Sequence, residues 1–480
     1  MKRVAIIGGG IGGLSAAGEL ARAGHSVTLF EGSDTLGGKA QVVTHHGVTL
    51  DTGPTLLTMP DTVRQTFSRL GADDLLPTFH RMPLQSQYRY ADGRDFFCWE
   101  DLDRAVESAN GFGAHEGQGL RDFYVAAERI YRAAGEPYLE APYEGMPTFM
   151  GRVLKRGLGT MLTGLKLSTL DQLARKHFET EALRMFAGRF ATYTGGSPYE
   201  ASAAFAMIPH IERAYGVHHV EGGMGALVQA LATAVRRLGV TVHTQARARW
   251  EKRGAGFLAG VAGDEREFDA VVVNQDPLQL LGREHEPLAM SGYVFFVDVP
   301  KRVSLPHHLI VFSKDYAAEF AELFSGVVPS DPTIYVCHPA ATDRTMAPDG
   351  RSGLFVMVNV PAFTDAERAR EEWPAQAKRL QQLCLTALRS HFAELRDVEL
   401  EVFAERTPLD LAARGAPGGS IYGFLPHGKF GPFRRPHLKG RDQGVFFAGG
   451  GTHPGGGVPL VMLSGRFAAG LAHAHLGGTR

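Results

Sequence analysis

Apolar and polar positions near the start of the chain follow two different periods. Residues 4–7 form an unbroken apolar run, which is typical of a buried strand, and residues 27–30 form a second run. Between them, residues 14–21 carry apolar side chains at helical spacing, and Gly24 ends that pattern. A glycine-rich stretch, 8–13, separates the first run from the helical pattern. The predicted order is therefore strand, glycine turn, helix, strand.

The same combination of buried strands and amphipathic helices returns far downstream. Short apolar runs bounded by glycine predict strands, and longer stretches with apolar residues three and four apart predict helices. These elements are a helix over 224–238, strands at 240–242, 269–274 and 445–448, and a helix over 460–471.

Strands and helices in this order are typical of one parallel sheet, even where the chain departs between them. Residues 1–75, 215–290 and 406–480 are therefore predicted to form a single discontinuous nucleotide-binding domain. The long insertions, 76–214 and 291–405, are expected to build a substrate-binding domain. A chain of 480 residues is long enough for both. The predicted fold class is α/β, with an inserted α+β domain.

The glycine turn has the spacing of a dinucleotide-binding fingerprint. Gly8 permits the tight turn, Gly10 lets the backbone approach a pyrophosphate, and Gly13 lets helix and strand pack closely. The following helix directs its free N–H groups and its positive dipole end toward phosphate. Glu31 ends the second strand, where a carboxylate can accept hydrogen bonds from ribose hydroxyls. The full context predicts dinucleotide binding.

A secretory signal peptide is the alternative interpretation of the amino end, where Met1-Lys2-Arg3 precedes apolar and small residues. Five of the six residues at 8–13 are glycine, which disfavours a helical signal core. Glu19 and Arg22 then interrupt the stretch. The strand interpretation is preferred, and a cytoplasmic protein is expected.

Charge balance and cysteine content argue against several other functions. The chain has 50 Lys and Arg against 51 Asp and Glu, so its net charge of −1 gives no support for a nucleic-acid partner. Its three cysteines are widely spaced, which indicates neither a disulfide framework nor a zinc site. Adjacent histidines are discounted as metal ligands because neighbouring side chains point in different directions. These pairs are His45-His46, His218-His219 and His307-His308.

No stretch approaches 18 uninterrupted apolar residues, so no membrane-spanning helix is predicted. Residues 146–167 nevertheless form a basic amphipathic pattern, which can lie in a bilayer interface. An ordinary helix that faces the core is the alternative, and three glycines in the segment disfavour a regular helix. Its apolar positions are Phe149, Met150, Val153, Leu154, Leu158, Met161, Leu162 and Leu165.

Taken together, the glycine blocks resemble those of the carotenoid desaturases, the bacterial-type phytoene desaturase family of flavin oxidoreductases. The resemblance runs nearly end to end. The turn at 415–423 and the segment 463–466 are most similar to the hydroxycarotenoid 3,4-desaturases. The motifs that carry the resemblance are Gly8 to Gly13 with Glu31, Gly37-Gly38-Lys39, 51–55, Gly222-Gly223-Met224, 331–335, 347–350, and the signature from Gly449 to Pro459, which continues to Ser464-Gly465-Arg466.

The resemblance implies a Rossmann-like FAD-binding domain of the amine-oxidase and GDI-like superfamily, with a helical membrane-facing region. It also implies that FAD is gripped along its whole length, with Arg247 contributing its backbone on the adenine side. The expected cofactor-binding residues are Gly8, Gly10, Ile11, Gly12, Gly13, Glu31, Gly38, Lys39, Gly53, Pro54, Thr55, Arg247, Gly449, Gly450, Thr452 and Val458.

The implied reaction removes two hydrogens from a carbon–carbon bond flanked by a polyene, one of them as hydride to the flavin. His453 is the candidate catalytic group near the ring, with a structural role in the glycine turn as its alternative. Tyr293, Phe295 and Val297 alternate along a predicted strand and are candidates to face the substrate, although ordinary sheet core would show the same pattern. Quinone or oxygen is the expected final electron acceptor.

A carotenoid substrate favours the interfacial interpretation of 146–167, and so a cytoplasmic enzyme attached peripherally to the membrane. Two other functions stay open. One is a different flavin oxidase of the same fold, acting on an amine or on protoporphyrinogen. The other is a non-catalytic lipid-binding or escort protein, which need not keep every glycine block of the flavin grip.

Overall fold

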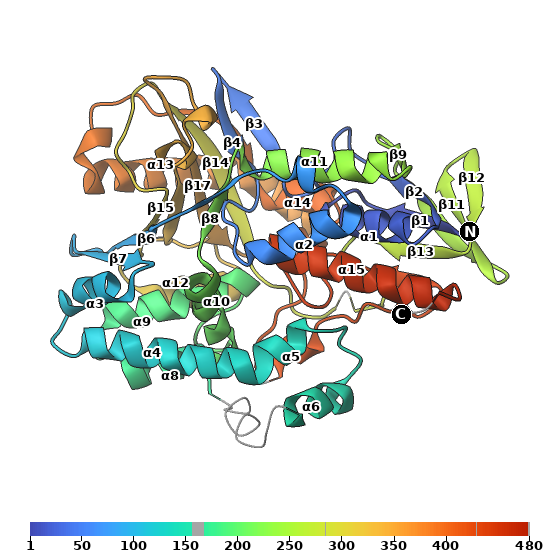
Figure 1. Ribbon diagram of the computed structural model, residues 1–480. Helices are drawn as coiled ribbons and strands as arrows, with labels where there is room; N and C mark the ends of the chain where they lie inside the picture. Colours follow the sequence, from blue (N-terminus) through green and yellow to red (C-terminus); the bar gives the residue numbers. More distant parts are fainter. Residues whose placement is uncertain (156–167, 284, 429, 479–480) are drawn as a thin grey trace.

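A five-stranded parallel sheet organises one half of the molecule (Figure 1). The computed structural model describes residues 1–155, 168–283, 285–428 and 430–478. The strand order is β19-β13-β1-β2-β9, and every neighbouring pair is parallel. The strands are β1 (Arg3–Ile7), β2 (Ser26–Phe30), β9 (Thr241–His243), β13 (Ala270–Val273) and β19 (Val445–Phe447).

Helices cover one face of this parallel sheet, and a small antiparallel sheet covers the other. Val4 and Ile6 point into a core shared with the helices, whereas Ala5 and Ile7 point toward Phe257 and its neighbours. Alternation along β1 thus buries both faces, as its continuous apolar run predicts. The covering elements are α1 (Ile11–Arg22), α2 (Pro60–Leu70), α11 (Gly223–Arg237) and α15 (Val458–His475), opposite β10 (Arg249–Arg253), β11 (Gly256–Val261) and β12 (Asp264–Phe268).

A seven-stranded mixed sheet organises the other half, in the order β18-β14-β17-β16-β15-β6-β7. The long helix α13 (Ala366–His391) packs on one of its faces through Trp373, Leu380 and Leu388. The strands are β6 (Leu84–Arg89), β7 (Asp95–Trp99), β14 (Ser291–Val299), β15 (His308–Val311), β16 (Ile334–Cys337), β17 (Ser352–Val360) and β18 (Glu401–Arg406).

A layer of shorter helices packs against the β6, β7 and β15 edge of the mixed sheet (Figure 1). Tyr88, Phe96 and Ile310 of these strands share one apolar core with the helices. The helices of this region are α3 (Leu102–Asn110), α4 (Glu116–Ile130), α5 (Glu136–Leu139), α6 (Met146–Leu154), α8 (Leu170–His177), α9 (Glu181–Gly188), α10 (Met207–Tyr215) and α12 (Tyr316–Phe324).

Two small antiparallel sheets of two strands each join the halves. β3 pairs with β4, and Val48 and Leu50 of β4 contact the mixed sheet. β5 pairs with β8, which leads directly into α11. The remaining elements are β3 (Val42–His45), β4 (Val48–Asp51), β5 (Phe79–Arg81), β8 (His218–Val220) and α14 (Pro408–Ala413).

The parallel sheet draws its strands from all three separated segments, 1–75, 215–290 and 406–480. Each strand expected from an apolar run is present, with ends displaced by one residue or so. The helix expected over 460–471 is longer, because α15 begins at Val458 directly behind the glycine signature. Among the described residues, no helix is both long and apolar enough to cross a bilayer.

The structure describes only part of the amphipathic segment 146–167. Its first part is α6, whose Phe149 and Val153 are buried against Tyr143 while Leu154 is 47% exposed. This part therefore follows the alternative of a helix that faces the core on one side. Residues 156–167, with Leu158, lie outside the described residues.

Close packing between α1 and α15 generates a stability prediction. A Cβ at Gly465 would overlap the Gly12 carbonyl oxygen and lie 2.8 Å from Ser15 Cβ, whereas one at Gly470 on the same helix meets nothing within 4 Å. We expect Gly465→Ala to lower stability by about 1–3 kcal/mol through overpacking. We expect Gly470→Ala, its matched control, to be neutral or to stabilise by about 0.5–1 kcal/mol. Denaturant unfolding measures both; equal effects would contradict the close contact.

Candidate functional site

The turn between β1 and α1 leaves no room for side chains. Gly8 has a φ of +104°, and a Cβ there would lie 2.9 Å from the Asn274 carbonyl oxygen. A Cβ at Gly13 would overlap the Gly8 carbonyl oxygen. Gly10 stands immediately before α1, which begins at the buried Ile11. The turn therefore presents backbone N–H groups and the helix N-terminus, the arrangement that binds a pyrophosphate.

Glu31 lies beside this turn, at the end of β2. Its Oε2 accepts from Gly9 N at 2.7 Å, and its Oε1 accepts from Ser33 N and Ser33 Oγ at 2.8 Å each. A carboxylate has about four acceptor positions. These contacts orient Glu31 and leave about one position for a ribose hydroxyl.

Asn274 connects three chain segments beneath the turn. From the sequence alone it was predicted only to end the strand at 269–274. In the amide orientation that satisfies both groups, it accepts from Gly10 N at 3.2 Å and donates to Ala448 O at 3.1 Å. A Cβ at Gly449 would lie 2.8 Å from the nearest atom of the same amide group. A polar residue at the carboxyl end of a predicted parallel strand was the available signal, because ligands bind at that edge.

A second layer of backbone approaches the turn from residues 37–39. Gly37 N donates to Gly9 O at 2.9 Å, and a Cβ at Gly38 would lie 3.3 Å from Gly10 Cα. Lys39 Nζ donates to Ile421 O at 2.5 Å. Solvent reaches the Lys39 side chain, yet its ammonium lies among protein atoms, as expected in a recess. Desolvation there lowers the pKa of Lys39, while nearby Asp276 opposes the shift.

Asp51 links two of the motifs, 51–55 and Gly222-Gly223-Met224, through hydrogen bonds. Its carboxylate accepts from Met224 N at 2.9 Å and Gly225 N at 3.1 Å, and so caps the start of α11. This anchor holds the segment after Asp51 beside the start of α11. Gly53, Pro54 and Thr55 of that segment line a cavity between the two halves.

The C-terminal signature lines the same cavity from the other side. Gly450 O accepts from Arg435 Nη1 at 2.8 Å, and residues 454–460, including Val458 at the start of α15, form cavity wall. Gly449 N donates to Ser464 Oγ at 3.0 Å. Thr452 is fully buried and donates to Pro436 O at 2.7 Å, so its side chain braces the turn. Among these groups Arg435 had not been predicted.

His453 does not line the cavity. Its ring is 1% exposed, its Nε2 lies 3.2 Å from Ala141 O, and Tyr138 and Phe467 pack against it. Burial lowers the pKa of His453 to about 3, and the ring is therefore neutral near neutral pH. The structure favours the structural alternative, because the signature turns this side chain away from the cavity and into the protein.

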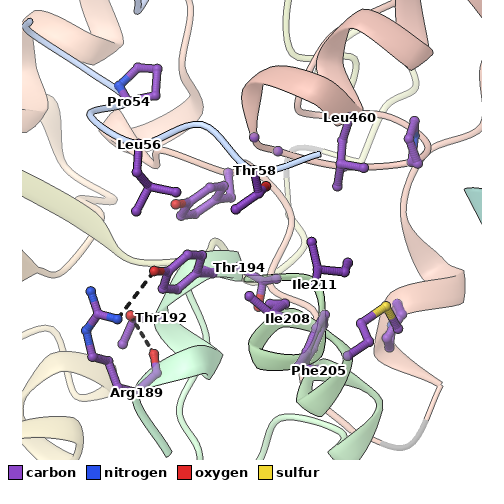
Figure 2. Close-up of a pocket in the computed structure, with 18 of the residues that line it drawn as sticks. Pro54, Leu56, Thr58, Arg189, Thr192, Thr194, Phe205, Ile208, Ile211 and Leu460 are labelled. Atoms are coloured by element: carbon purple, nitrogen blue, oxygen red, sulfur yellow. Dashed lines mark hydrogen bonds between the residues drawn. The ribbon is translucent and has the colours of Figure 1, made fainter. Parts of the chain in front are cut away.

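The cavity has an apolar side and a polar side (Figure 2). Phe205, Ile208 and Leu460 lie on one side, and Arg189 and Thr192 lie on the other. Among the described residues, neither a carboxylate nor an imidazole is part of the wall. Its further apolar members include Leu56, Met59, Leu139, Met207, Ile211, Phe355, Met357, Phe430 and Phe433.

The prediction that Tyr293, Phe295 and Val297 face the substrate is wrong. All three are buried on the face of the mixed sheet that packs against α13. Cavity residues Phe355 and Met357 of β17 occupy the opposite face. Alternation along a strand groups residues by face, but only the packing of the sheet decides which face meets the cavity.

Arg247 lies on the surface beside Gly32, next to Glu31, and its Nη2 donates to Ala413 O at 3.3 Å. Its neighbour Ala246 N donates to Glu31 O at 2.7 Å, which places the Arg247 backbone at the predicted adenine side. The adenine-side role of this backbone stays a prediction.

Two histidine pairs discounted from sequence have gained ligand-type neighbours from distant segments. His307 and His308 lie near Cys337, and the ligand-type atoms of the three fall within 4.8 Å of one another. The pair His45-His46 similarly meets Asp298 and Glu401. Adjacent histidines can therefore join ligand-type clusters through distant segments, although Arg351 already pairs with Asp298.

The buried ring of His453 generates a pH prediction. The folded protein keeps the ring neutral, whereas the unfolded chain protonates an ordinary histidine near pH 6.5. Proton uptake by His453 in the unfolded chain therefore lowers the stability of the folded protein as pH falls from about 6.5 toward 3. We expect His453→Gln to reduce the fall in melting temperature between about pH 8 and pH 5. Exposed His285→Gln is the control and should leave the fall unchanged. A shifted pH profile of substrate-driven flavin reduction in His453→Gln would instead restore a catalytic role.

Comparison with known proteins agrees with this geometry. The family described as flavin containing amine oxidoreductase matches residues 11–473. The chain is 34% identical to hydroxyneurosporene desaturase of Cereibacter sphaeroides, over 97% of this chain and 96% of that protein. It is 31% identical to 4,4'-diaponeurosporene oxygenase of Staphylococcus haemolyticus over 97% of this chain and 96% of that protein. For 4,4'-diapophytoene desaturase of the same species the identity is 29%, over 97% of each chain.

Among solved structures, cyclohexylamine oxidase from Brevibacterium oxydans superposes with a TM-score of 0.64 at 16% identity, covering 99% of each chain. At that identity the likeness establishes the shared fold alone. The two-layer arrangement of a dinucleotide-type sheet and a mixed sheet is thus the amine-oxidase fold.

Proposed function

The chain belongs to the flavin containing amine oxidoreductase family, and from this premise we propose that it is an FAD-dependent desaturase of acyclic carotenoids. The observation that carries the proposal is the cavity itself. Its wall combines both flavin-side motifs, 53–55 and 454–460, with a long run of apolar and aromatic side chains. A polyene of many carbons is the ligand class that such a wall accommodates.

The residues present fit FAD. The Gly8 to Gly13 turn offers backbone N–H groups, Glu31 keeps about one acceptor position for ribose, and Gly38 brings backbone close to Gly10. Lys39 is exposed to solvent, but its ammonium donates to Ile421 O and is attracted by Asp276, and a cation there suits a polar part of the cofactor. FAD is the cofactor of this fold, and these residues are proposed to hold it.

When bound, the flavin supplies a hydride acceptor. The protein's part is to orient the polyene and to keep water from the reacting bond, which the apolar wall does. The cation left on a conjugated chain is a strong acid, so a weak acceptor suffices for the proton. The Tyr335 hydroxyl is a cavity group connected to a base, since it lies 2.7 Å from His308 Nδ1 and 2.6 Å from Thr55 Oγ1. Burial lowers the pKa of His308 to about 3, and its ring is therefore neutral and able to accept.

The charges in the wall disfavour amine oxidation. An ammonium substrate would meet the Arg189 and Arg435 guanidinium groups and no carboxylate among the described residues of the wall. Buried like charges without a counter-ion are costly. A non-catalytic escort protein is disfavoured on other grounds, because the whole set of close backbone contacts suited to FAD is present.

The relative named hydroxyneurosporene desaturase supports a finer proposal. We infer that the substrate is a 1-hydroxy or methoxy carotenoid that is desaturated at C-3,4. The final electron acceptor is proposed to be a quinone or oxygen.

A substrate panel tests the proposed reaction. FAD-loaded protein is incubated in liposomes with acyclic carotenoids, and separately with amines. We expect flavin bleaching without oxygen, a red shift of the carotenoid spectrum and a product lighter by two hydrogens per new double bond. An oxygen-containing product would indicate an oxygenase, and reduction by amines alone would overturn the proposal.

A membrane-bound substrate requires docking, and two exposed apolar side chains lie where docking is expected. Phe430 is 53% exposed and also lines the cavity, and Leu154 on α6 is 47% exposed. The ring centroid of Phe433, three residues after Phe430, lies 4.9 Å from that of Phe149 in α6, so the two exposed side chains belong to one region. We propose that this region attaches the enzyme peripherally to the cytoplasmic side of a membrane, with α6 as part of the predicted segment 146–167.

Charge substitution tests the attachment. Each of Leu154→Asp and Phe430→Asp places a carboxylate in the proposed contact and should reduce partitioning onto liposomes about tenfold or more, because burying an ion in lipid costs about 2.5–3.5 kcal/mol. Val327→Asp, at a residue 53% exposed elsewhere, is the control and should sediment like the parent. Unchanged sedimentation of both test variants would remove this region from the interface.

A further inference from the structure

One buried charge in the cavity is not used by the proposed reaction. Arg189, the first residue of a short helical turn after α9, is 9% exposed and forms part of the cavity wall. Arg435, the other cation of the wall, belongs to the flavin side because it donates to Gly450 O. Arg189 belongs to the substrate layer, and its role requires a separate explanation.

Aromatic rings hold the Arg189 guanidinium in place. Its Cζ lies 5.3 Å from the Tyr193 ring centroid, 5.5 Å from that of Tyr88 and 6.0 Å from that of Tyr335. Such contacts orient a guanidinium without satisfying its N–H groups. The group is therefore fixed but incompletely hydrogen-bonded.

The hydrogen bonds of Arg189 are few and long. Its Nη1 lies 3.3 Å from Tyr193 Oη and 3.4 Å from Tyr88 Oη (Figure 2 draws contacts of this group). Among the described residues, no side-chain or backbone acceptor is bonded to its Nε or Nη2, and no carboxylate pairs with it directly. A guanidinium has five N–H donors, and a buried cation normally uses them.

Neighbouring polar groups in the wall are already satisfied within the protein. Thr192 Oγ1 donates to Arg189 O at 2.7 Å, and Thr194 Oγ1 donates to Ala191 O at 3.0 Å. Thr333 Oγ1 donates to Glu319 Oε2 at 2.6 Å. These three hydroxyls have used their donors, whereas Arg189, the cation on this side of the wall, keeps unused N–H groups.

Glu212 lies outside the cavity wall and is the carboxylate nearest in the network to the Arg189 guanidinium, to which Tyr193 connects it. It is 6% exposed, and its Oε1 accepts from Tyr193 Oη at 2.6 Å, so Tyr193 stands between the carboxylate and Arg189. The negative charge therefore lies outside the cavity wall, while the positive group lies on it. This arrangement suits a neutral ligand that carries an oxygen acceptor.

Resting on the proposed function, we propose that Arg189 binds the terminal oxygen of the carotenoid, a tertiary hydroxyl or an ether at one end of an otherwise apolar chain. The guanidinium donates to that oxygen, while the polyene lies along Phe205, Ile208 and Leu460 on the apolar side. A site built to hydrogen-bond one substrate group rejects the analogue that lacks it, because its own polar atoms are then left unpaired.

The position of Arg189 also determines which bond reacts. Tyr335, whose ring lies 6.0 Å from Arg189 Cζ, is hydrogen-bonded to Thr55 of the flavin-side motif at 2.6 Å. Arg189 is therefore separated from that motif by one tyrosine. An oxygen held there brings a carbon–carbon bond near the substituted end, rather than one in the middle of the chain, to the flavin side.

The experiment compares binding of two carotenoids of equal polyene length, one with a tertiary hydroxyl at one end and one without oxygen. Dissociation constants are measured by carotenoid spectral shift on FAD-loaded protein in detergent micelles. We expect the parent to prefer the hydroxylated carotenoid by about tenfold or more, the effect of a hydrogen bond to a charged group. Arg189→Gln should reduce the preference to about threefold or less, with FAD content unchanged.

Thr192→Val is the matched control. It removes a hydroxyl on the same side of the cavity, and that hydroxyl has no spare donor because it already donates to Arg189 O. It should keep the preference of the parent. Retained preference in Arg189→Gln, or no preference in the parent, would overturn the proposal. If neither carotenoid reduces the flavin of the parent, the proposed desaturase function fails instead; if both are desaturated without preference, only the role of Arg189 fails.

Discussion

Direct contact of backbone with backbone at the glycine turns is the constraint on which the rest of the structure depends. Gly13 must pass the Gly8 carbonyl, and Gly465 of α15 must pass the Gly12 carbonyl, with no side chain between them. These contacts bring the amino and carboxyl ends of the chain together over one sheet. The glycine turn after β1, the signature that follows β19 and the cavity wall are therefore held together by these contacts.

The cavity exists because two sheets meet through loops instead of through a continuous core. The motif after Asp51 is anchored to α11, and the signature is braced by Thr452, so both reach the same space from opposite sides. Apolar residues from α10 and the mixed sheet complete the wall. A buried guanidinium in such a wall is costly without an acceptor, and this is why Arg189 indicates the chemistry of the ligand's end.

Two buried histidines show that tertiary packing decides which role a side chain can have. His453 occurs within the glycine signature, yet the chain turns its ring toward Tyr138 and away from the cavity. The sequence offered His308 only as one of an adjacent pair discounted as metal ligands, but a hydrogen bond to Tyr335 connects it to the cavity. Residue type and motif membership suggested the first histidine, and only the direction of the side chains identified the second.

The sequence by itself determined the parallel sheet, its glycine turn and Glu31, because local periodicity, tight turns and charge placement are properties of neighbouring residues. It also carried the family resemblance. The tertiary structure alone decided which face of the mixed sheet meets the cavity, and so excluded Tyr293, Phe295 and Val297. It alone brought Arg189 to the wall, since that position results from packing among segments far apart in the chain. Alternation and spacing record which residues share a face, but what that face meets depends on contacts that close only in the folded protein.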